Sequence, residues 1–162
     1  MWFQLILCVH VLSAFVFFAA HGVSITVGLW ISTVRDPVRL HAALDLSGHV
    51  RTTSNLSLGI LLLSGLAAGF LGDSWGSAWI WISLLLFAFF TVLMWTRIGP
   101  AFRLLRSLIG PVGTQGETLS AVDPAMYPRV DAIIRRLRLP AVAWAGTAWL
   151  IVMVYLMVAR PF

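Results

Sequence analysis

Charged residues are few in this sequence, and lysine does not occur at all. Only 10% of the 162 residues are charged, 60% are hydrophobic, and all eleven basic residues are arginine. This composition excludes an ordinary soluble domain, in which about 25% of residues are charged. The net charge of +5 does not indicate a nucleic-acid partner either, because the arginines form no basic stripe interleaved with aromatic residues.

Cysteine and acidic residues are equally scarce. The single cysteine, Cys8, excludes an intramolecular disulfide and a cysteine-rich metal site. The six acids all fall in expected loops or at helix ends, so we expect no proton relay through the apolar part of the chain. No serine–histidine–acid set and no phosphate-binding loop occurs, and we therefore do not expect an enzyme.

Four long apolar runs are what the sequence does contain. Each is long enough for the roughly 20 residues that cross a bilayer, which predicts an all-α fold, a four-helix transmembrane bundle that forms a single domain over residues 1–162. The expected helices cover residues 2–32, 52–71, 77–96 and 140–158. The first run lacks a basic start and is about twice as long as the apolar core of a signal peptide, so we expect it to remain as a span. Gly48 is expected to end a short surface helix before the second span.

The arginines are distributed unevenly between the two sides of the expected bundle. Ten lie on the two long connections or at their edges, whereas Arg160 alone lies on the other side. The positive-inside rule then places both termini outside, in what we expect to be the lipid bilayer of a bacterial cytoplasmic (inner) membrane. In the long connection between the third and fourth helices, residues 128–138 repeat apolar positions at helical spacing, which predicts a cytoplasmic amphipathic helix at the membrane surface. Residues 110–124, rich in Gly, Pro, Ser and Thr, are expected to be mobile.

Two histidines, His10 and His21, lie within the first apolar run. Their separation of 11 residues places them on one helix face, about 16 Å apart. An ionisable side chain at membrane depth is costly and indicates a functional site. Small residues on the same face leave room for a flat partner, and haem b is our leading hypothesis because imidazole is a common axial ligand in helical bundles. Histidines that are simply hydrogen-bonded to a neighbouring helix remain the open alternative.

Depth along the expected helices separates the two histidines. Met153 lies at a depth similar to that of His10, and Met157 follows one turn further out on the same face, so a His10–Met153 axial pair is possible. At the depth of His21 the other expected helices offer no histidine or methionine. A five-coordinate site, a ligand from a second copy of the chain, or no cofactor is then expected at His21.

Copper is an alternative metal at the outer side of the bundle. His10, Met153 and Met157 carry the imidazole and thioether groups that suit Cu(I). Cys8 projects about 200° away from His10 on a helix and cannot join them.

A second group of possible metal ligands lies in the first connection. His41 and His49 flank Asp45 at four-residue spacing, which one continuous helix would bring onto one side. Because Gly48 is expected to interrupt that helix, we favour a surface cluster without metal. Trp149, near the middle of the fourth helix, needs an acceptor for its indole N–H, although packing in the core is the simpler interpretation.

Two short segments resemble those of known bacterial membrane proteins. Residues 7–14 read Leu-Cys-Val-His-Val-Leu-Ser-Ala, and residues 156–162 read Leu-Met-Val-Ala-Arg-Pro-Phe. These segments and the hydropathy plan resemble an uncharacterised family of four-helix integral membrane proteins, related to copper-resistance D-type membrane domains and to the small membrane protoporphyrinogen oxidases. The resemblance implies haem b with His10 as ligand, or copper. The oxidases carry a Pro-Arg pair after the first helix where this chain has Val23-Ser24-Ile25-Thr26, so their activity is not carried over.

Two functions from different classes are consistent with this sequence. The first is a b-type haem protein that transfers electrons or serves as a subunit of a redox complex, with His10, His21 and Met153 as cofactor-binding residues. The second is an accessory or scaffold subunit without a cofactor, which packs against a larger membrane complex or a second copy. Gly65 and Gly69, and the alanine-rich start of the fourth helix, are small-residue surfaces suited to such packing.

Overall fold

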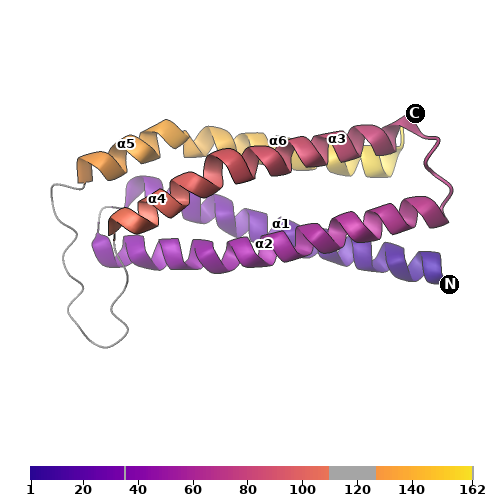
Figure 1. Ribbon diagram of the computed structural model, residues 1–162, viewed down its shortest axis with the longest axis horizontal. Coiled ribbons are helices and arrows are strands. Elements are labelled where there is room, and N and C mark those ends of the chain that lie inside the picture. The colour runs from indigo at the N-terminus through magenta and orange to yellow at the C-terminus, as the bar shows by residue number, and fades with distance from the viewer. Residues whose placement is uncertain (35, 110–126, 162) are drawn as a thin grey trace.

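The fold was examined in a computed structural model that describes residues 1–34, 36–109 and 127–161. Figure 1 shows that the described part consists of helices running along one long axis. The elements are α1 (Trp2–Thr33), α2 (Pro37–Leu71), α3 (Ala78–Leu93), the π-helical segment η1 (Met94–Ile98), α4 (Gly99–Ile109), α5 (Tyr127–Leu137) and α6 (Leu139–Ala159). The predicted all-α four-helix bundle is confirmed. Arg35 and the segment 110–124, which was expected to be mobile, lie outside the described residues.

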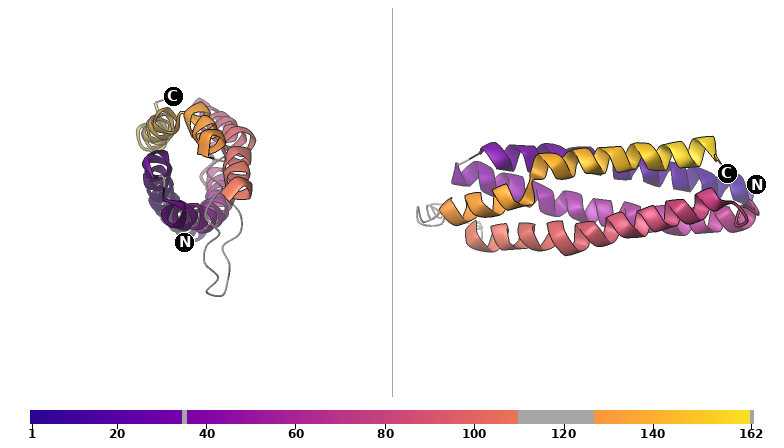
Figure 2. Two further views of the ribbon diagram at one scale, coloured as in Figure 1. Left: turned by 90° about the vertical axis from the view of Figure 1, so that its left-hand side faces the viewer. Right: turned by 90° about the horizontal axis from the view of Figure 1, so that it is seen from above.

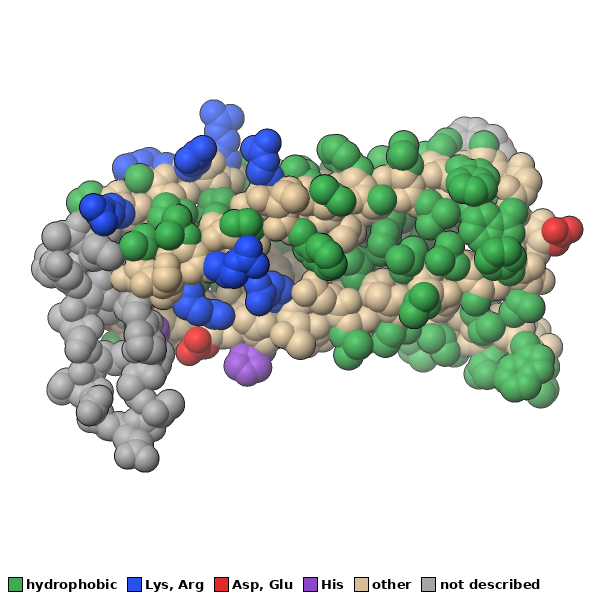
Figure 3. Space-filling view, in the orientation of Figure 1, with side chains coloured by type: hydrophobic (Ala, Val, Ile, Leu, Met, Phe, Trp, Pro, Cys, Tyr) green, Lys and Arg blue, Asp and Glu red, His purple; other side chains and the backbone are tan. Residues whose placement is uncertain are grey.

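The four rods of the bundle are longer than the predicted spans. The apolar helical stretches are Trp2–Thr33, Val38–Leu71, Ala78–Leu108 and Pro128–Ala159, of 31 to 34 residues each. At 1.5 Å per residue they extend about 47–51 Å, whereas the hydrocarbon core of a bilayer is about 30 Å thick. Both termini lie at one end of the bundle (Figures 1 and 2), and arginine side chains gather towards the opposite end (Figure 3). We call these two ends the terminal end and the arginine end.

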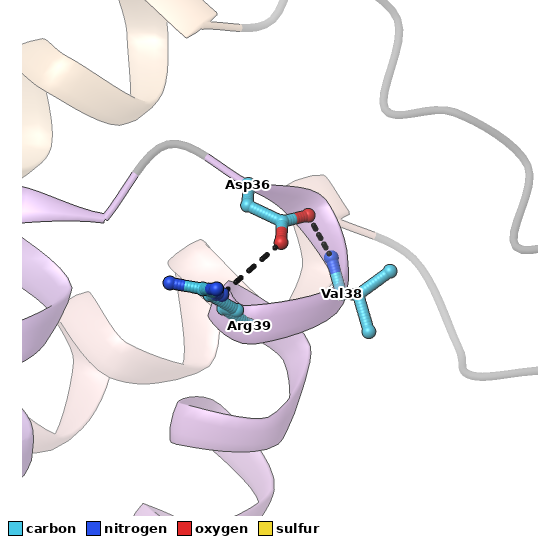
Figure 4. A network of polar contacts seen from close by, with 3 residues as sticks. All are labelled: Asp36, Val38 and Arg39. Atoms are coloured by element: carbon cyan, nitrogen blue, oxygen red, sulfur yellow. Dashed lines mark hydrogen bonds and ion pairs between the residues drawn. The ribbon is translucent and has the colours of Figure 1, made fainter.

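Helix α2 is continuous through Gly48, so the predicted break there is wrong. The helix begins where the sequence indicates, because Asp36 Oδ1 accepts a hydrogen bond from the Val38 amide at 3.1 Å and Pro37 opens the first turn (Figure 4). Asp36 Oδ2 also lies 3.5 Å from Nε of Arg39. In the polar stretch that follows, hydroxyl groups are satisfied by carbonyls one turn earlier in the helix, as Thr52 Oγ1 donates to the Gly48 carbonyl at 3.3 Å.

Helices α4 and α5 are amphipathic, as predicted for the long connection. Their apolar faces pack against other helices of the bundle. Leu105 of α4 and Val130 of α5 are 0% and 2% exposed, and both belong to one buried cluster with Val27 and Ile31 of α1. The apolar repeat predicted the amphipathic helix correctly, but it did not predict that other helices of the bundle cover the apolar face.

The packing of the bundle is uneven. Helices α1 and α2 pack closely along their length, whereas α3 and α6 contact their neighbours at fewer positions. Between these helices, Phe17, Phe90, Trp149 and Met153 form a second buried cluster in the middle of the bundle. Near the terminal end, Trp75 lies 4.8 Å from Phe70 and 5.5 Å from Trp81, measured between ring centroids. The close α1–α2 pair and the looser α3–α6 side together leave the space described next.

Candidate functional site: an internal cavity beside His21

The two histidines of α1 share a face, as predicted, but they meet different helices. His10 Nδ1 lies 3.0 Å from the Leu61 carbonyl oxygen and 3.2 Å from Ser64 Oγ, both on α2. Since a carbonyl can only accept, Nδ1 carries the proton and donates it to Leu61. Gly65 makes this contact possible, because a Cβ there would lie 2.9 Å from His10 Cε1. His10 therefore has a hydrogen-bond partner on α2.

His21 faces α6 instead and has a free ring nitrogen. Its Nε2 atom is buried and has no hydrogen-bond partner among the described residues. A Cβ at Gly146 would lie 2.7 Å from both Cε1 and Nε2, so the imidazole rests against bare helix backbone. Phe17 supports the ring from one side, with its ring centroid 6.1 Å away. A buried polar nitrogen without a partner requires an explanation, such as water, an ion or a ligand.

His21 forms part of the wall of a cavity of about 590 Å³ that lies between all four rods. This volume falls within the roughly 300–1,000 Å³ typical of small-molecule sites. At one end the wall is aromatic, with Phe17, Phe90 and Trp149; at the other end it carries arginines of α2 and α4. In Figure 3 a hollow opens on the surface next to blue arginine side chains.

The depth of the cavity follows from helix geometry. Twenty residues, or about 30 Å, counted from the terminal end reach Gly22 on α1, Arg51 on α2, Ile98 at the end of η1 and Leu139 on α6. If the hydrocarbon layer begins at the terminal end, His21 lies near its other limit, with the aromatic wall inside the layer and the arginines at its edge or beyond. The same cavity joins an apolar compartment to a cationic one.

Trp149 contributes a second unpartnered polar atom to the cavity wall. Its ring stacks on Phe90 with centroids 4.5 Å apart, and the indole nitrogen is buried without a partner among the described residues. The sequence predicts this need for an acceptor, although core packing is the simpler interpretation of Trp149 from the sequence alone. The structure shows both, since the ring lies in the aromatic cluster while its N–H remains unsatisfied.

Met94 is a residue of the cavity wall that was not predicted from the sequence. It opens the π-helical segment η1 and lines the cavity together with His21. Depth had been counted from the expected arginine-side ends of the helices. Those ends are not level with one another, so the counts could not be compared. Counted from the terminal end, His21 and Met94 lie 19 and 16 residues along their rods, hence at similar depth. A π-helical segment within a span is itself frequent at functional sites and has no clear signature in the sequence.

The remaining predicted ligands lie elsewhere. Met153 is buried in the aromatic cluster, and Met157 packs against the same cluster. Cys8 is exposed on α1.

His41 and His49, expected in the first connection, both lie in α2 and have different surroundings. His41 is buried at 9% exposure, whereas His49 is exposed and its Nδ1 lies 3.0 Å from the Asp45 carbonyl oxygen, one turn back on the same helix. In the described ranges of the chain, no group of three or more His, Cys, Asp or Glu side chains could hold a metal ion.

Fold and composition together define a multi-pass membrane protein, an all-α four-helix bundle with an internal cavity. No protein-family model, no curated protein and no solved structure matches the chain. Its function must therefore be inferred from the cavity and the residues around it.

Proposed function

We propose that this chain is a b-type haem-binding membrane protein that takes part in electron transfer, with His21 as an iron ligand. The observation that carries the proposal is the buried Nε2 atom of His21, which lacks a partner on the wall of an internal cavity. A neutral imidazole nitrogen with a free lone pair is a common ligand of haem iron. In helical bundles such cofactors lie between facing helices, as this cavity does.

Other residues of the wall fit the same cofactor. Met94 carries a thioether, and histidine with methionine is a known axial pair that raises the reduction potential of haem. The rings of Phe17, Phe90 and Trp149 offer an apolar surface for a macrocycle. Bound haem would supply one-electron chemistry, and the chain would supply the ligand and the apolar surroundings.

Gly146 has a defined part in this proposal. The His21 ring rests against it, so Nε2 reaches the cavity only when the ring turns away from α6. Because glycine has no side chain, the imidazole can lie directly against the α6 backbone when no ligand is bound. The proposal therefore includes a change in the side-chain orientation of His21 on binding.

This arrangement favours His21 over His10 as the ligand, which reverses the order of the sequence analysis. His10 already donates to α2 and does not line the cavity. The copper alternative and the His10–Met153 pair draw less support, because His10 is engaged on α2 and Met153 packs among aromatic rings. The accessory-subunit alternative relied on Gly65 and Gly69, whose open sides are taken within the chain by His10 and Trp75. It also relied on the alanine-rich start of α6, where Ala141, Ala145 and Ala148 stay exposed.

A visible absorption spectrum tests the proposal. The chain is expressed with haem available, purified in detergent and compared with His21→Ala and His10→Ala variants. We expect a Soret band in the parent and in His10→Ala, and loss of the band in His21→Ala. Added imidazole should restore the band in His21→Ala, which a purely structural role of His21 would not produce.

Two other results would count against the proposal, and a third would restrict it. No Soret band in well-folded parent protein points to the accessory subunit without a cofactor. A band lost only in His10→Ala returns the site to the outer side of the bundle. A Met94→Leu variant with an unchanged spectrum and reduction potential removes Met94 from the site but leaves His21 as the ligand.

A further inference from the structure

Three arginines from two different helices converge on one end of the cavity. Arg51 of α2 and Arg103 and Arg106 of α4 all line its wall. The positive-inside rule explains why arginines are on this side of the membrane, but it does not explain why three of them border the cavity. All three side chains are exposed, as are those of Arg129 and Arg136 of α5, but Arg129 and Arg136 do not line the cavity.

The positive charge at this end is not neutralised by the cavity wall. None of the described residues that line the cavity is an Asp or a Glu. Arg106 donates one hydrogen bond to the Leu44 carbonyl, which fixes the position of its guanidinium above Gly48. Guanidinium groups held in this way form strong, charge-assisted hydrogen bonds to carboxylate and phosphate.

Helix α2 adds neutral polar groups on the same side. Ser47, Ser54 and Asn55 line the cavity at positions that share a helix face with Arg51. The Asn55 amide makes no hydrogen bond within the described part of the chain, although it lies about 24 Å along the rod from Leu71 and so within the bilayer thickness. Polar groups at that depth are costly without partners. Asn55 is exposed at the cavity wall, where its amide can bind water or the polar part of a ligand.

The apolar part of the cavity narrows the class of ligand. Beyond the arginines the wall continues through Ile25, Leu58 and Met94 to the aromatic residues. A small free anion would satisfy the arginines but leave this apolar volume without an occupant. An amphiphile fills both parts, with its charged head at the inner limit of the hydrocarbon layer and its apolar body within that layer.

We propose that the arginine end of the cavity binds the carboxylate or phosphate head of an amphiphile taken from the membrane. Arg51, Arg103 and Arg106 hold the head, while the apolar and aromatic wall holds the body. Haem, with its carboxylates at one edge, has the same general chemistry, but this inference does not depend on haem. It concerns the head-group site, whereas the haem proposal concerns His21.

The test uses haem-free protein in neutral detergent and measures adducts by native mass spectrometry. Palmitate is the probe, methyl palmitate tests the need for charge, and inorganic phosphate tests the need for a chain. We expect palmitate to bind at least about tenfold more tightly than its ester, since each guanidinium–carboxylate bond is worth about tenfold or more. Phosphate in excess should not displace palmitate.

Two pairs of variants assign the site. The double variant Arg51→Gln/Arg103→Gln should weaken palmitate binding by about tenfold or more, whereas Arg129→Gln/Arg136→Gln, with the same loss of charge outside the cavity, should not. Gly48→Ala keeps every charge but places a Cβ 2.8 Å from Arg106 Nη2, so the guanidinium must move and binding should weaken. Gly59→Ala, where a Cβ meets nothing within 4 Å, is the matched control.

The outcomes separate this inference from the haem proposal. Equal binding of acid and ester, equal loss in both double variants, or displacement by phosphate alone would each overturn the head-group site. Failure of the parent to show a Soret band would leave it intact, since palmitate binding is measured without haem. Conversely, a Soret band dependent on His21 with no arginine effect on palmitate would support haem alone.

Discussion

His10 and His21 lie on one face of α1, and each meets a glycine of a neighbouring helix. Gly65 of α2 receives His10, and Gly146 of α6 receives His21. Helical spacing was sufficient to predict the shared face, but not the partners. Those depend on how neighbouring helices are rotated and crossed, which is set by the packing of the whole bundle and not by local sequence. The small-residue pattern at Gly65 was recognised as a packing surface, although its partner is a side chain and not a second backbone.

A substitution at Gly65 tests the His10 contact. Gly65→Ala places a Cβ 2.9 Å from His10 Cε1, so the ring must shift and weaken its bond to Leu61. We expect a loss of about 1–3 kcal/mol in unfolding free energy, the usual cost of overpacking. Unfolding in mixed detergent, followed by circular dichroism, measures it.

The control for Gly65 is another glycine of α2. Gly59→Ala adds a methyl group where nothing lies within 4 Å, and replacing glycine by alanine within a helix favours the helix by up to about 1 kcal/mol. Unchanged or higher stability is expected there. If both variants lose stability equally, the loss comes from α2 itself and the contact with His10 is unimportant.

Helices α4 and α5 show how far the hydrophobic pattern of an element can be interpreted. The repeat of apolar residues correctly predicted a helix within the long connection, together with its apolar face. It could not distinguish lipid from protein as the cover of that face, since both are apolar. Gly48 shows a second limit of local sequence. Its glycine suggested a helix break, but α2 continues through this position and Arg106 of α4 packs over it.

Adjacent leucines of α4 test the cover of its apolar face. Leu105 is 0% exposed and Leu104 is 50% exposed. We expect Leu105→Ala to cost about 2–5 kcal/mol, as for other buried leucines, and Leu104→Ala to change stability by no more than about 0.5 kcal/mol. Chemical or thermal unfolding of the purified protein compares them. Similar effects at both positions would indicate that α4 lies on the membrane and not against the bundle.

At the scale of the whole molecule, composition and hydropathy predicted the class, the number of long helices and the side on which arginines collect. They did not predict the cavity, because a cavity is what remains after four helices pack unevenly. Met94 is an example, since it lines the same cavity as His21 although nothing in the sequence distinguished it from the other methionines. The candidate site was thus predicted only in part, through His21 and Trp149.

The orientation of the bundle can be tested by labelling cysteines in intact cells. With Cys8→Ser as the parent, Gly76→Cys introduces a thiol in the turn between α2 and α3. Arg129→Cys introduces one at an exposed position of α5. By the positive-inside rule, a membrane-impermeant maleimide should label Gly76→Cys in whole cells and Arg129→Cys only after lysis. The reverse pattern would show that the arginine end faces outward.

The buried cluster at the arginine end has a consequence for biogenesis. It joins residues near the end of α1 to residues near the start of α6, among them Val27, Leu105, Val130 and Leu139. A nascent chain cannot complete this cluster until its last span has inserted. Until then, apolar faces of α1 and α4 remain open to water just outside the bilayer. We expect quality-control proteases and chaperones to distinguish finished from unfinished chains at this point, because exposed apolar surface is the feature they recognise.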